Sequence, residues 1–141
     1  MQIEGGNQLA AALRAYGAAA ERHVADAVNA TGLELRGEIV KAYQRGPASG
    51  VTYEKSNPNR THTASAPGQA PATDTGRLAS SVEFRREGAM SATVGSQVAY
   101  AAMLEFGTSR IDPRPAWVPA AEAMRPKFRQ RLERALERAA R

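Results

Sequence analysis

The sequence predicts an α+β fold in which a long N-terminal helix and a C-terminal helix pack on a small antiparallel β-sheet. Near both ends of the chain, apolar residues recur every three or four positions, which is the period of one helix face. Between these segments, apolar and polar residues alternate on either side of a Glu-Gly turn, which is typical of a β-hairpin. A chain of 141 residues fits one domain and is too short for two, so we expect a single domain over residues 1–141.

The first predicted helix extends from about Asn7 to Tyr43, and the segment 1–45 is assigned to it. Unbroken, it would span about 55 Å at roughly 1.5 Å per residue, which is long for a compact domain of this size. Gly32 and Gly37 lower the helix propensity in the middle, so the helix is either continuous or kinked near these two glycines. We expect part of it to project from the domain or to pack on a neighbour. The apolar positions of the helix are Leu9, Leu13, Tyr16, Ala20, Val24, Ala27, Val28, Leu35, Ile39 and Tyr43.

The segment 46–74 has a different composition, rich in Gly, Pro, Ser, Thr and Asn. Only residues 51–53 are predicted to form a short strand. Loops of this length inside small domains are either disordered or functional, so we expect an extended loop that becomes ordered when the protein assembles. Tyr53, Pro67 and Gln69 are the loop residues that we expect to contact a partner.

A short helix and a β-hairpin are expected next. The helix is predicted at 76–81, with Asp74 or Thr75 as its N-cap, because these side chains accept hydrogen bonds from the amides of a first helical turn. Apolar and polar residues then alternate over 82–86 and again over 92–94, which predicts two paired strands. The residues of the middle of the chain expected in the core are Leu78, Val82, Phe84, Val94, Tyr100, Leu104, Phe106 and Trp117.

A third helix is predicted at 98–106, where Gly107 can adopt the left-handed conformation that ends a helix. The segment 75–116 therefore contains a hairpin and two short helices. The last segment, 117–141, is predicted to be a basic helix with Pro119 in its first turn. Its apolar stripe is expected to consist of Trp117, Ala121, Met124, Phe128, Leu132 and Leu136.

The net charge of +5 comes mainly from the face of the last helix that lies opposite this stripe. Such a face is compatible with solvent, with an acidic partner or with nucleic acid. Arg129, Arg134 and Arg138 are the candidate partner contacts on it. The basic residues of the segment are Arg125, Lys127, Arg129, Arg131, Arg134, Arg138 and Arg141.

The composition predicts a thin core. Hydrophobic residues make up 43% of the chain but aromatic residues only 6%, and much of the apolar fraction is alanine, which buries little surface per residue. We therefore expect an oligomer in which neighbours stabilise part of the fold. Met1–Gly6 lacks the basic segment and apolar run of a secretory signal peptide, and no stretch reaches the roughly 20 apolar residues that span a bilayer. We expect a soluble, cytoplasmic protein until it joins an assembly.

Catalytic and metal-binding patterns are not recognisable in the sequence. The chain has no cysteine, and its two histidines, His23 and His62, have no carboxylate at a metal-ligand spacing. Glu105 is the one acid in an otherwise apolar predicted helix. We expect it to be a buried carboxylate paired with Arg77 or Arg114 rather than a general base. The sequence therefore predicts no enzymatic activity and no cofactor.

Four motifs in a fixed order resemble a known family. They are APGQAP at 66–71, TDTGRL at 73–78, LEFGTS at 104–109 and PRP at 113–115. Their combination resembles the small tail-component family of long-tailed bacteriophages, which includes head–tail joining, neck and tail-completion proteins of phages, prophages and gene-transfer particles. The resemblance covers about 66–121, together with the two terminal helices. The pair Tyr100-Ala101 before LEFGTS is a further part of the resemblance. Its motif residues are Gly76, Arg77, Leu78, Tyr100, Glu105, Phe106, Gly107, Pro113, Arg114 and Pro115.

The resemblance implies an α+β domain that assembles into a homo-oligomeric ring, for which we expect six copies. The ring would lie at the head–tail junction of the virion, between stopper or adaptor proteins and the tail-tube or terminator proteins. DNA would pass through it without sequence-specific reading. The resemblance does not imply catalysis or a cofactor, and we expect no small-molecule substrate and no membrane partner.

Two other functions are compatible with the sequence. A tail terminator, which caps the tail tube and stops its growth, forms a ring at the same place. A nucleic-acid-binding protein would use the basic last helix on phosphates, although that helix has no stacking aromatic residue beyond Phe128, which belongs to its apolar stripe.

Overall fold

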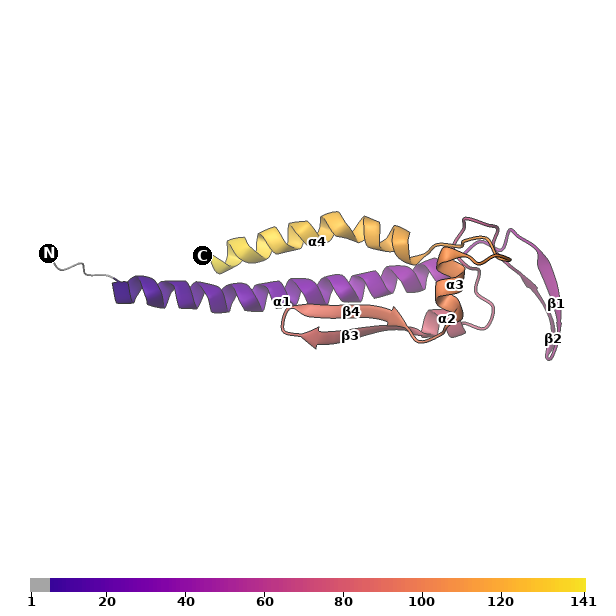
Figure 1. Cartoon of the computed structure of the whole chain (residues 1–141), viewed down its shortest axis with the longest axis horizontal. Coiled ribbons are helices and arrows are strands. Elements are labelled where there is room, and N and C mark those ends of the chain that lie inside the picture. Colours follow the sequence, from indigo (N-terminus) through magenta and orange to yellow (C-terminus); the bar gives the residue numbers. More distant parts are fainter. Residues whose placement is uncertain (1–5) are drawn as a thin grey trace.

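The computed structural model describes residues 6–141 and shows an elongated molecule organised around one long helix (Figure 1). This helix, α1, extends from Gly6 to Gln44 without a break. Of the two possibilities left open by the sequence, the continuous helix is therefore correct. Residues 1–5, which belong to the predicted segment 1–45 and to the stretch compared with a signal peptide, lie outside the described residues.

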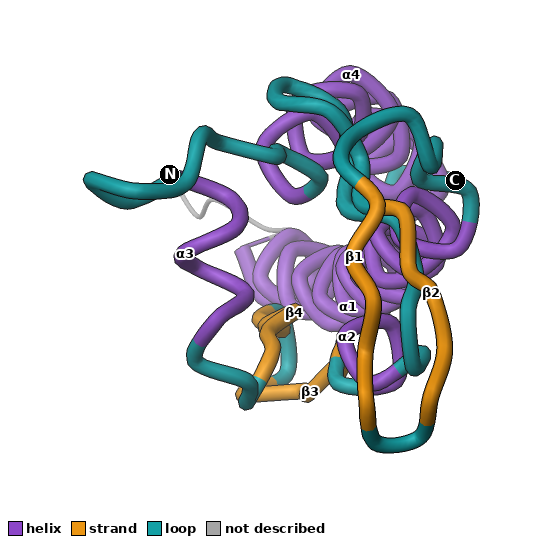
Figure 2. Tube along the Cα trace, turned by 90° about the vertical axis from the view of Figure 1, so that its right-hand side faces the viewer, coloured by secondary structure: helices purple, strands orange, loops and turns teal. Residues whose placement is uncertain are grey.

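The other elements lie around α1 and at its C-terminal end (Figure 1). The helix α4, Trp117–Ala139, runs back along one side of α1, and the hairpin β3–β4 lies on another side (Figure 2). The predicted α+β fold is confirmed, but the strands form two separate two-stranded sheets instead of one. The remaining elements are β1 (Thr52–Ser56), β2 (Asn59–Thr63), α2 (Arg77–Ser80), β3 (Val82–Gly88), β4 (Ser91–Ser96) and α3 (Tyr100–Phe106).

The hairpin β3–β4 packs closely on the middle of α1. Phe84 pairs with Val94 across the hairpin, and Val82 beside them is fully buried. A Cβ atom added to Gly32 of α1 would lie only 2.4 Å from the Phe84 ring. Gly32 therefore allows a close approach between helix and hairpin, and the Arg36 Nε adds a hydrogen bond of 2.9 Å to the Val82 carbonyl.

The hairpin β1–β2 lies within the segment 46–74, which the sequence predicted to be an extended loop with one short strand at 51–53. The short strand is confirmed in part, because residues 52 and 53 begin β1. The prediction of a loop for the remainder was wrong, because Thr52–Ser56 pairs with Asn59–Thr63 in antiparallel register. Polar residues pair along the whole hairpin, for example Thr52 with Thr63. Neither face is apolar, so the alternation that predicts a half-buried strand is absent from the sequence.

The core is thin, and it lies where the C-terminal half of α1 meets α2, β3 and the start of α4. Its buried residues are Ile39, Tyr43, Ala79, Val82 and Ala116. Leu78, Val94 and Trp117 pack against this cluster, as the sequence predicted. Tyr100 and Phe106, which were also expected in the core, are instead exposed, and 72% of Phe106 faces solvent.

The packed face of α4 differs from the predicted stripe. Met124 and Ala135 are buried, whereas Ala121 and Leu136 of the predicted stripe are exposed. Arg131 also lies on the side of α4 that faces α1, where its guanidinium donates hydrogen bonds to Thr31 and Glu34. The prediction placed every apolar residue of the stripe in the core, but α1 covers only the side of α4 that faces it.

Candidate functional site

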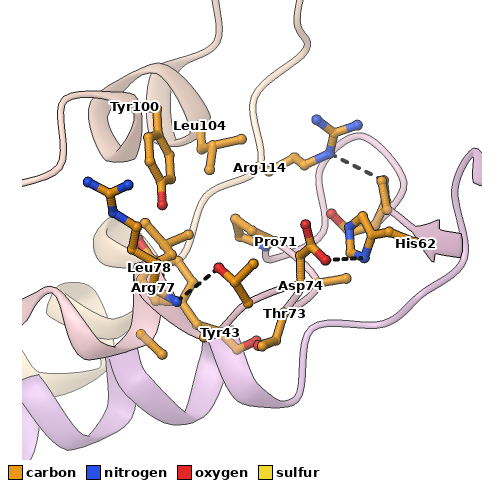
Figure 3. Close-up of a pocket in the computed structure, with 16 residues that line it drawn as sticks. Tyr43, His62, Pro71, Thr73, Asp74, Arg77, Leu78, Tyr100, Leu104 and Arg114 are labelled. Atoms are coloured by element: carbon orange, nitrogen blue, oxygen red, sulfur yellow. Dashed lines mark hydrogen bonds and ion pairs between the residues drawn. The ribbon is translucent and has the colours of Figure 1, made fainter. Parts of the chain in front are cut away.

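The family motifs come together at the C-terminal end of α1. They surround a cleft of about 270 Å³ whose walls come from α1, β2, α2, α3 and the segments before α2 and α4. Tyr100 and Leu104 of α3 lie on one side of it, and His62 and Arg114 lie on the other (Figure 3). Asp74 and Pro71 lie between them (Figure 3).

Glu105 is the buried carboxylate of this region, and it holds the start of α4. Its oxygens accept hydrogen bonds from the backbone N–H groups of Ala116 (2.7 Å), Trp117 (3.0 Å) and Val118 (2.8 Å). These donors have no partner inside a helix, and the positive end of the helix dipole favours a negative charge. Glu105 is therefore a cap supplied by another helix.

The predicted pairing of Glu105 with Arg77 or Arg114 was wrong. Arg77 is exposed on α2, and the Arg114 Nε donates to the Ser65 carbonyl at 3.2 Å. Backbone amides satisfy the Glu105 carboxylate at short range, so no guanidinium is needed. The prediction that Glu105 is buried is correct, since only 6% of the residue is exposed.

Gly107 fixes the loop that joins α3 to the PRP motif. Its φ of +75° is in the region that favours glycine, and an added Cβ would lie 2.8 Å from the Ile111 carbonyl oxygen. The loop is closed by a bond from the Thr108 N–H to that same carbonyl, at 2.8 Å. The Arg114 N–H then donates to the Leu104 carbonyl at 2.6 Å. The LEFGTS and PRP motifs are thus one closed turn.

The two proline motifs also meet. The Gly68 N–H of APGQAP donates to the Pro113 carbonyl of PRP at 2.8 Å, and Gly68 has a φ of +79°. Gln69 holds this loop from within, because its Oε1 accepts from the Ala66 N–H at 3.2 Å and from the Ser49 hydroxyl at 2.5 Å. Gly76, the residue before α2, has a φ of +77°. The glycines and hydrogen-bonding side chains of these motifs therefore determine the backbone conformation of the loops.

Tyr43 links three of these segments. Its hydroxyl accepts a hydrogen bond of 2.5 Å from the Trp117 Nε1, and its carbonyl accepts one of 2.5 Å from the Thr73 hydroxyl. Burial raises the pKa of the Tyr43 phenol, so it stays neutral. The sequence identified Tyr43 as an apolar helix position but gave no sign of this connecting role.

Asp74 anchors the β1–β2 hairpin. It forms ion pairs with Lys55 and Arg60 of the hairpin, and the His62 Nδ1 lies 3.8 Å from its Oδ1 (Figure 3). The hydrogen bond from Lys55, together with the one from Arg60, lowers the pKa of the Asp74 carboxyl. The sequence interpreted Asp74 or Thr75 as an N-cap of the following helix. The Thr75 hydroxyl accepts a hydrogen bond of 3.4 Å from the N–H of Arg77, the first residue of α2, so Thr75, and not Asp74, makes the capping contact that was predicted.

A second ionic contact joins α1 to α4. Glu34 accepts hydrogen bonds from Lys127, at 2.8 Å, and from Arg131. These bonds lower the pKa of Glu34 to about 2. The Arg131 guanidinium also donates to the Thr31 hydroxyl at 3.1 Å. Two basic residues of the last helix are therefore occupied within the molecule.

The candidate partner contacts remain at the surface. Tyr53, Pro67 and Gln69 are exposed, and so are Arg129, Arg134 and Arg138. Over residues 6–141, no group of three or more His, Cys, Asp and Glu side chains is placed to hold a metal ion. None of the helices in this part of the chain is long and apolar enough to cross a membrane.

The fold and the motif cluster define a class of protein. It is an elongated α+β protein whose motifs shape loops and whose large apolar side chains are partly uncovered, features typical of a component of a larger assembly. Residues 7–107 match the model of the family described as "Bacteriophage HK97-gp10, putative tail-component". The chain belongs to this family of phage tail components, as its motifs predicted, and is therefore a protein of the virion.

The matched region begins in α1 and ends at Gly107. It includes APGQAP, TDTGRL and most of LEFGTS, but the PRP motif and α4 lie beyond it. No curated protein and no solved structure matched the chain.

Proposed function

We propose that this tail component forms a homo-oligomeric ring of six copies at the head–tail junction, where it joins the completed tail to the DNA-filled head. Membership of the tail-component family supports this role, and so does the combination of motifs in the sequence. Each copy would contribute an elongated subunit, and its shaped loops would contact the proteins above and below.

The observation that carries the proposal is the uncovered apolar surface at both ends of the molecule. At the free end of α1, Leu9 and Leu13 are each 61% exposed. At the opposite end, Met103 and Phe106 of α3 point mainly into solvent. Soluble monomers rarely leave such side chains uncovered in groups, so neighbours in an assembly would bury them.

The neighbours of the ring would be stopper or adaptor proteins on the head side and tail-tube or terminator proteins on the tail side. The β1–β2 hairpin and the loop with Pro67 and Gln69 would reach one of them. The exposed Arg129, Arg134 and Arg138 would meet an acidic surface of another. DNA would pass through the ring without specific contacts, because a passage that binds phosphates strongly slows transit.

Electron microscopy of particles produced without this protein tests the proposal. We expect filled heads beside separate tails of normal length, since both parts would be complete but unjoined. Overlong tails would instead make the protein the tail terminator. Intact particles with attached tails would contradict both functions.

Nucleic-acid binding is the second candidate, and the exposed arginines of α4 are the feature that favours it. Binding through these residues would weaken steeply as salt rises, with a slope that falls by about 3 when three phosphate contacts are removed. The variant Arg129→Ala/Arg134→Ala/Arg138→Ala, measured over a salt series, tests this. Binding that is weak at moderate salt, or equal in the variant, would reject it.

A further inference from the structure

We propose that the cleft at the C-terminal end of α1 is a docking site for an acidic peptide segment of another protein of the particle, in which a Glu or Asp side chain stands next to an apolar one. The proposal requires a component of a particle, which family membership makes this chain, but neither the ring nor its place at the junction. It is argued from the charge around the cleft, from a buried hydroxyl in its wall and from its apolar lining.

The first argument is that cations outnumber carboxylates around the cleft. Arg77 lies on one side of it and Arg114 on the other (Figure 3). Within residues 6–141, neither arginine forms an ion pair. Asp74 is the one acidic residue of the lining, and its oxygens are occupied by Lys55 and Arg60. Four cationic side chains therefore surround one carboxylate, and a second carboxylate would be attracted into the cleft.

The second argument is a hydroxyl group in the wall that has no partner inside the described part of the chain. Ser65 lines the cleft and is 1% exposed, and its Oγ forms no hydrogen bond with residues 6–141. The Ser65 carbonyl is already used, since it accepts from the Arg114 Nε at 3.2 Å. Buried hydroxyls are nearly always hydrogen-bonded, because an unpaired one has lost its bond to water. A carboxylate that enters the cleft beside Arg114 would supply the missing acceptor.

The third argument is that apolar side chains form much of the remaining wall. Pro71, Leu78, Tyr100 and Leu104 line the cleft. Its volume of about 270 Å³ is just below the ~300 Å³ at which small-ligand sites begin, so it admits a few side chains of a peptide. DNA presents phosphates without apolar side chains and matches only the charge of the cleft. A peptide with adjacent acidic and apolar residues matches both the charge and the lining.

The charge of the whole molecule favours another protein over a second copy of this chain. The net charge is +5, so two copies repel each other at a distance, whereas an acidic segment is attracted. Each of the four motifs also supplies a lining residue, namely Pro71, Leu78, Leu104 and Arg114. The cleft is therefore built from the parts of the sequence that resemble other tail components.

A nuclear magnetic resonance titration of the full chain tests the chemistry of the site. The probes are acetyl-Leu-Glu-Leu-amide, its neutral match acetyl-Leu-Gln-Leu-amide, and inorganic phosphate. We expect the Glu peptide to shift the amide signals of Ser65, Arg77 and Tyr100, with a dissociation constant on the order of millimolar. The Gln peptide should bind at least about tenfold more weakly, because hydrogen bonds between charged groups are stronger. Equal binding of the two peptides, tighter binding of phosphate, or no binding at about 10 mM would overturn the proposal.

Variants of two cleft residues separate binding from folding. Arg77→Gln removes a charge at an exposed position and should weaken binding of the Glu peptide by about tenfold, whereas Arg85→Gln, exposed on β3, is the control and should not change it. Ser65→Ala should weaken binding by about fivefold and keep the melting temperature, since no bond to residues 6–141 is lost. A lower melting temperature of Ser65→Ala with unchanged peptide binding would assign the hydroxyl to the fold and contradict the proposal.

Photocrosslinking in assembled particles identifies the occupant. Tyr100→p-benzoylphenylalanine places a photoreactive group in the wall of the cleft, and Tyr16→p-benzoylphenylalanine, at an equally exposed position of α1, is the control. We expect the first to crosslink to one other particle protein, within a segment that mass spectrometry shows to carry Glu or Asp beside an apolar residue. The control should not reach that segment, and adding Arg77→Gln should reduce the yield.

Three results of the crosslinking would reject the acidic segment as the occupant. They are crosslinks to DNA, crosslinks to a second copy of this chain, and crosslinks to a segment without an acidic residue. An uncrosslinked Tyr100 variant in intact particles would show that the cleft has no occupant and would reject the proposal as well. The junction role is tested separately by the particles that lack the protein, so either proposal can fail without the other.

Discussion

The two β-hairpins have the same antiparallel pairing but are attached to the molecule by different forces. β3–β4 lies along α1, with Val82 fully buried and the Phe84 ring against Gly32. β1–β2 lies across the end of α1 (Figure 2), and none of its residues is buried. Ion pairs from Lys55 and Arg60 to Asp74 connect it to the segment before α2.

β3–β4 is therefore an integral part of the fold, whereas β1–β2 is an arm attached to it by ion pairs. Burial of apolar side chains depends little on salt or pH, so β3–β4 should unfold only with the core. Partly exposed ion pairs are screened by salt and contribute little to global stability. The arm can therefore change its position or open locally while α1, α4 and β3–β4 remain folded. Such behaviour suits a segment that docks on another protein of the assembly.

The largest effect is expected when the burial that holds β3–β4 is removed. Phe84→Ala should lower the free energy of unfolding by about 3 kcal/mol, near the lower end for such truncations because the ring is half-buried. Thermal or urea denaturation followed by circular dichroism measures this. Arg85→Ala, which changes an exposed residue on the other face of the same strand, is the control and should differ by less than about 0.5 kcal/mol. Equal effects of the two changes would mean that β3–β4 is not part of the core.

A pair of glycine substitutions in α1 sharpens the same point. Gly37→Ala should stabilise the protein by about 0.5–1 kcal/mol, because alanine favours the helix and nothing lies within 4 Å of the new Cβ. Gly32→Ala should instead destabilise it by about 1 kcal/mol, since the Phe84 ring must move away. In the Phe84→Ala background, Gly32→Ala should become stabilising. Denaturation of the four variants measures the coupling, and additive effects would exclude a direct contact between Gly32 and Phe84.

The contrast between the hairpins also explains what the sequence could predict. α1, α4 and β3–β4 bury one apolar face each, and burial leaves a period of 3.6 or 2 in the sequence. β1–β2 buries no face, so only residues 51–53 of this segment were predicted as strand and the rest was predicted as loop. The motif glycines were interpreted correctly as helix boundaries, since Gly76 precedes α2 and Gly107 follows α3. Gly76 has the left-handed helical conformation, whereas Gly107, with φ of 75° and ψ of 178°, has a more extended conformation and does not form the left-handed helix end that was predicted.

Contacts with backbone groups and with other molecules produce no periodic pattern of apolar residues in the sequence. Glu105 was expected to be buried, but the amides that it caps are common to every residue, so the sequence suggested an arginine instead. Asp74 or Thr75 was interpreted as the cap of the adjacent helix. Thr75 does accept the Arg77 N–H, whereas the partners of Asp74 lie 14 and 19 residues away. Phe106 and Leu9 are apolar at helical spacing, and this pattern does not distinguish an internal contact from one between molecules.

Removal of the ionic anchor should affect the arm alone. In Asp74→Asn, we expect amide hydrogen exchange in β1–β2 to become faster, because Lys55 and Arg60 lose their charged partner. The midpoint of thermal unfolding should stay close to that of the parent chain. High salt should produce the same faster exchange in the parent chain and change the variant little. The control is Glu54→Gln, at an exposed position of β1. Unchanged exchange in Asp74→Asn would show that the arm is held by something other than these ion pairs.

The smallest effect is expected when the ion pairs of Glu34 on α1 with Lys127 and Arg131 on α4 are lost. Lys127 and Arg131 lower the pKa of Glu34 from its ordinary value of 4.5 to about 2 in the folded protein. A carboxyl group with a lowered pKa stabilises the fold above its unfolded pKa, and the stabilisation is lost as the pH falls through the folded value. The free energy of unfolding should therefore decrease between pH 4.5 and about 2, and this decrease should be smaller in Glu34→Gln. Denaturant titrations at a series of pH values measure both curves. Because Met124 and Ala135 are buried on α4, the α1–α4 contact should weaken in acid without separating. β1–β2 has no buried residue, so it should lose its protection from exchange once acid protonates Asp74, whose pKa Lys55 and Arg60 hold below its ordinary value. Parallel loss of protection in α4 and β1–β2 would mean that charge, and not burial, holds both.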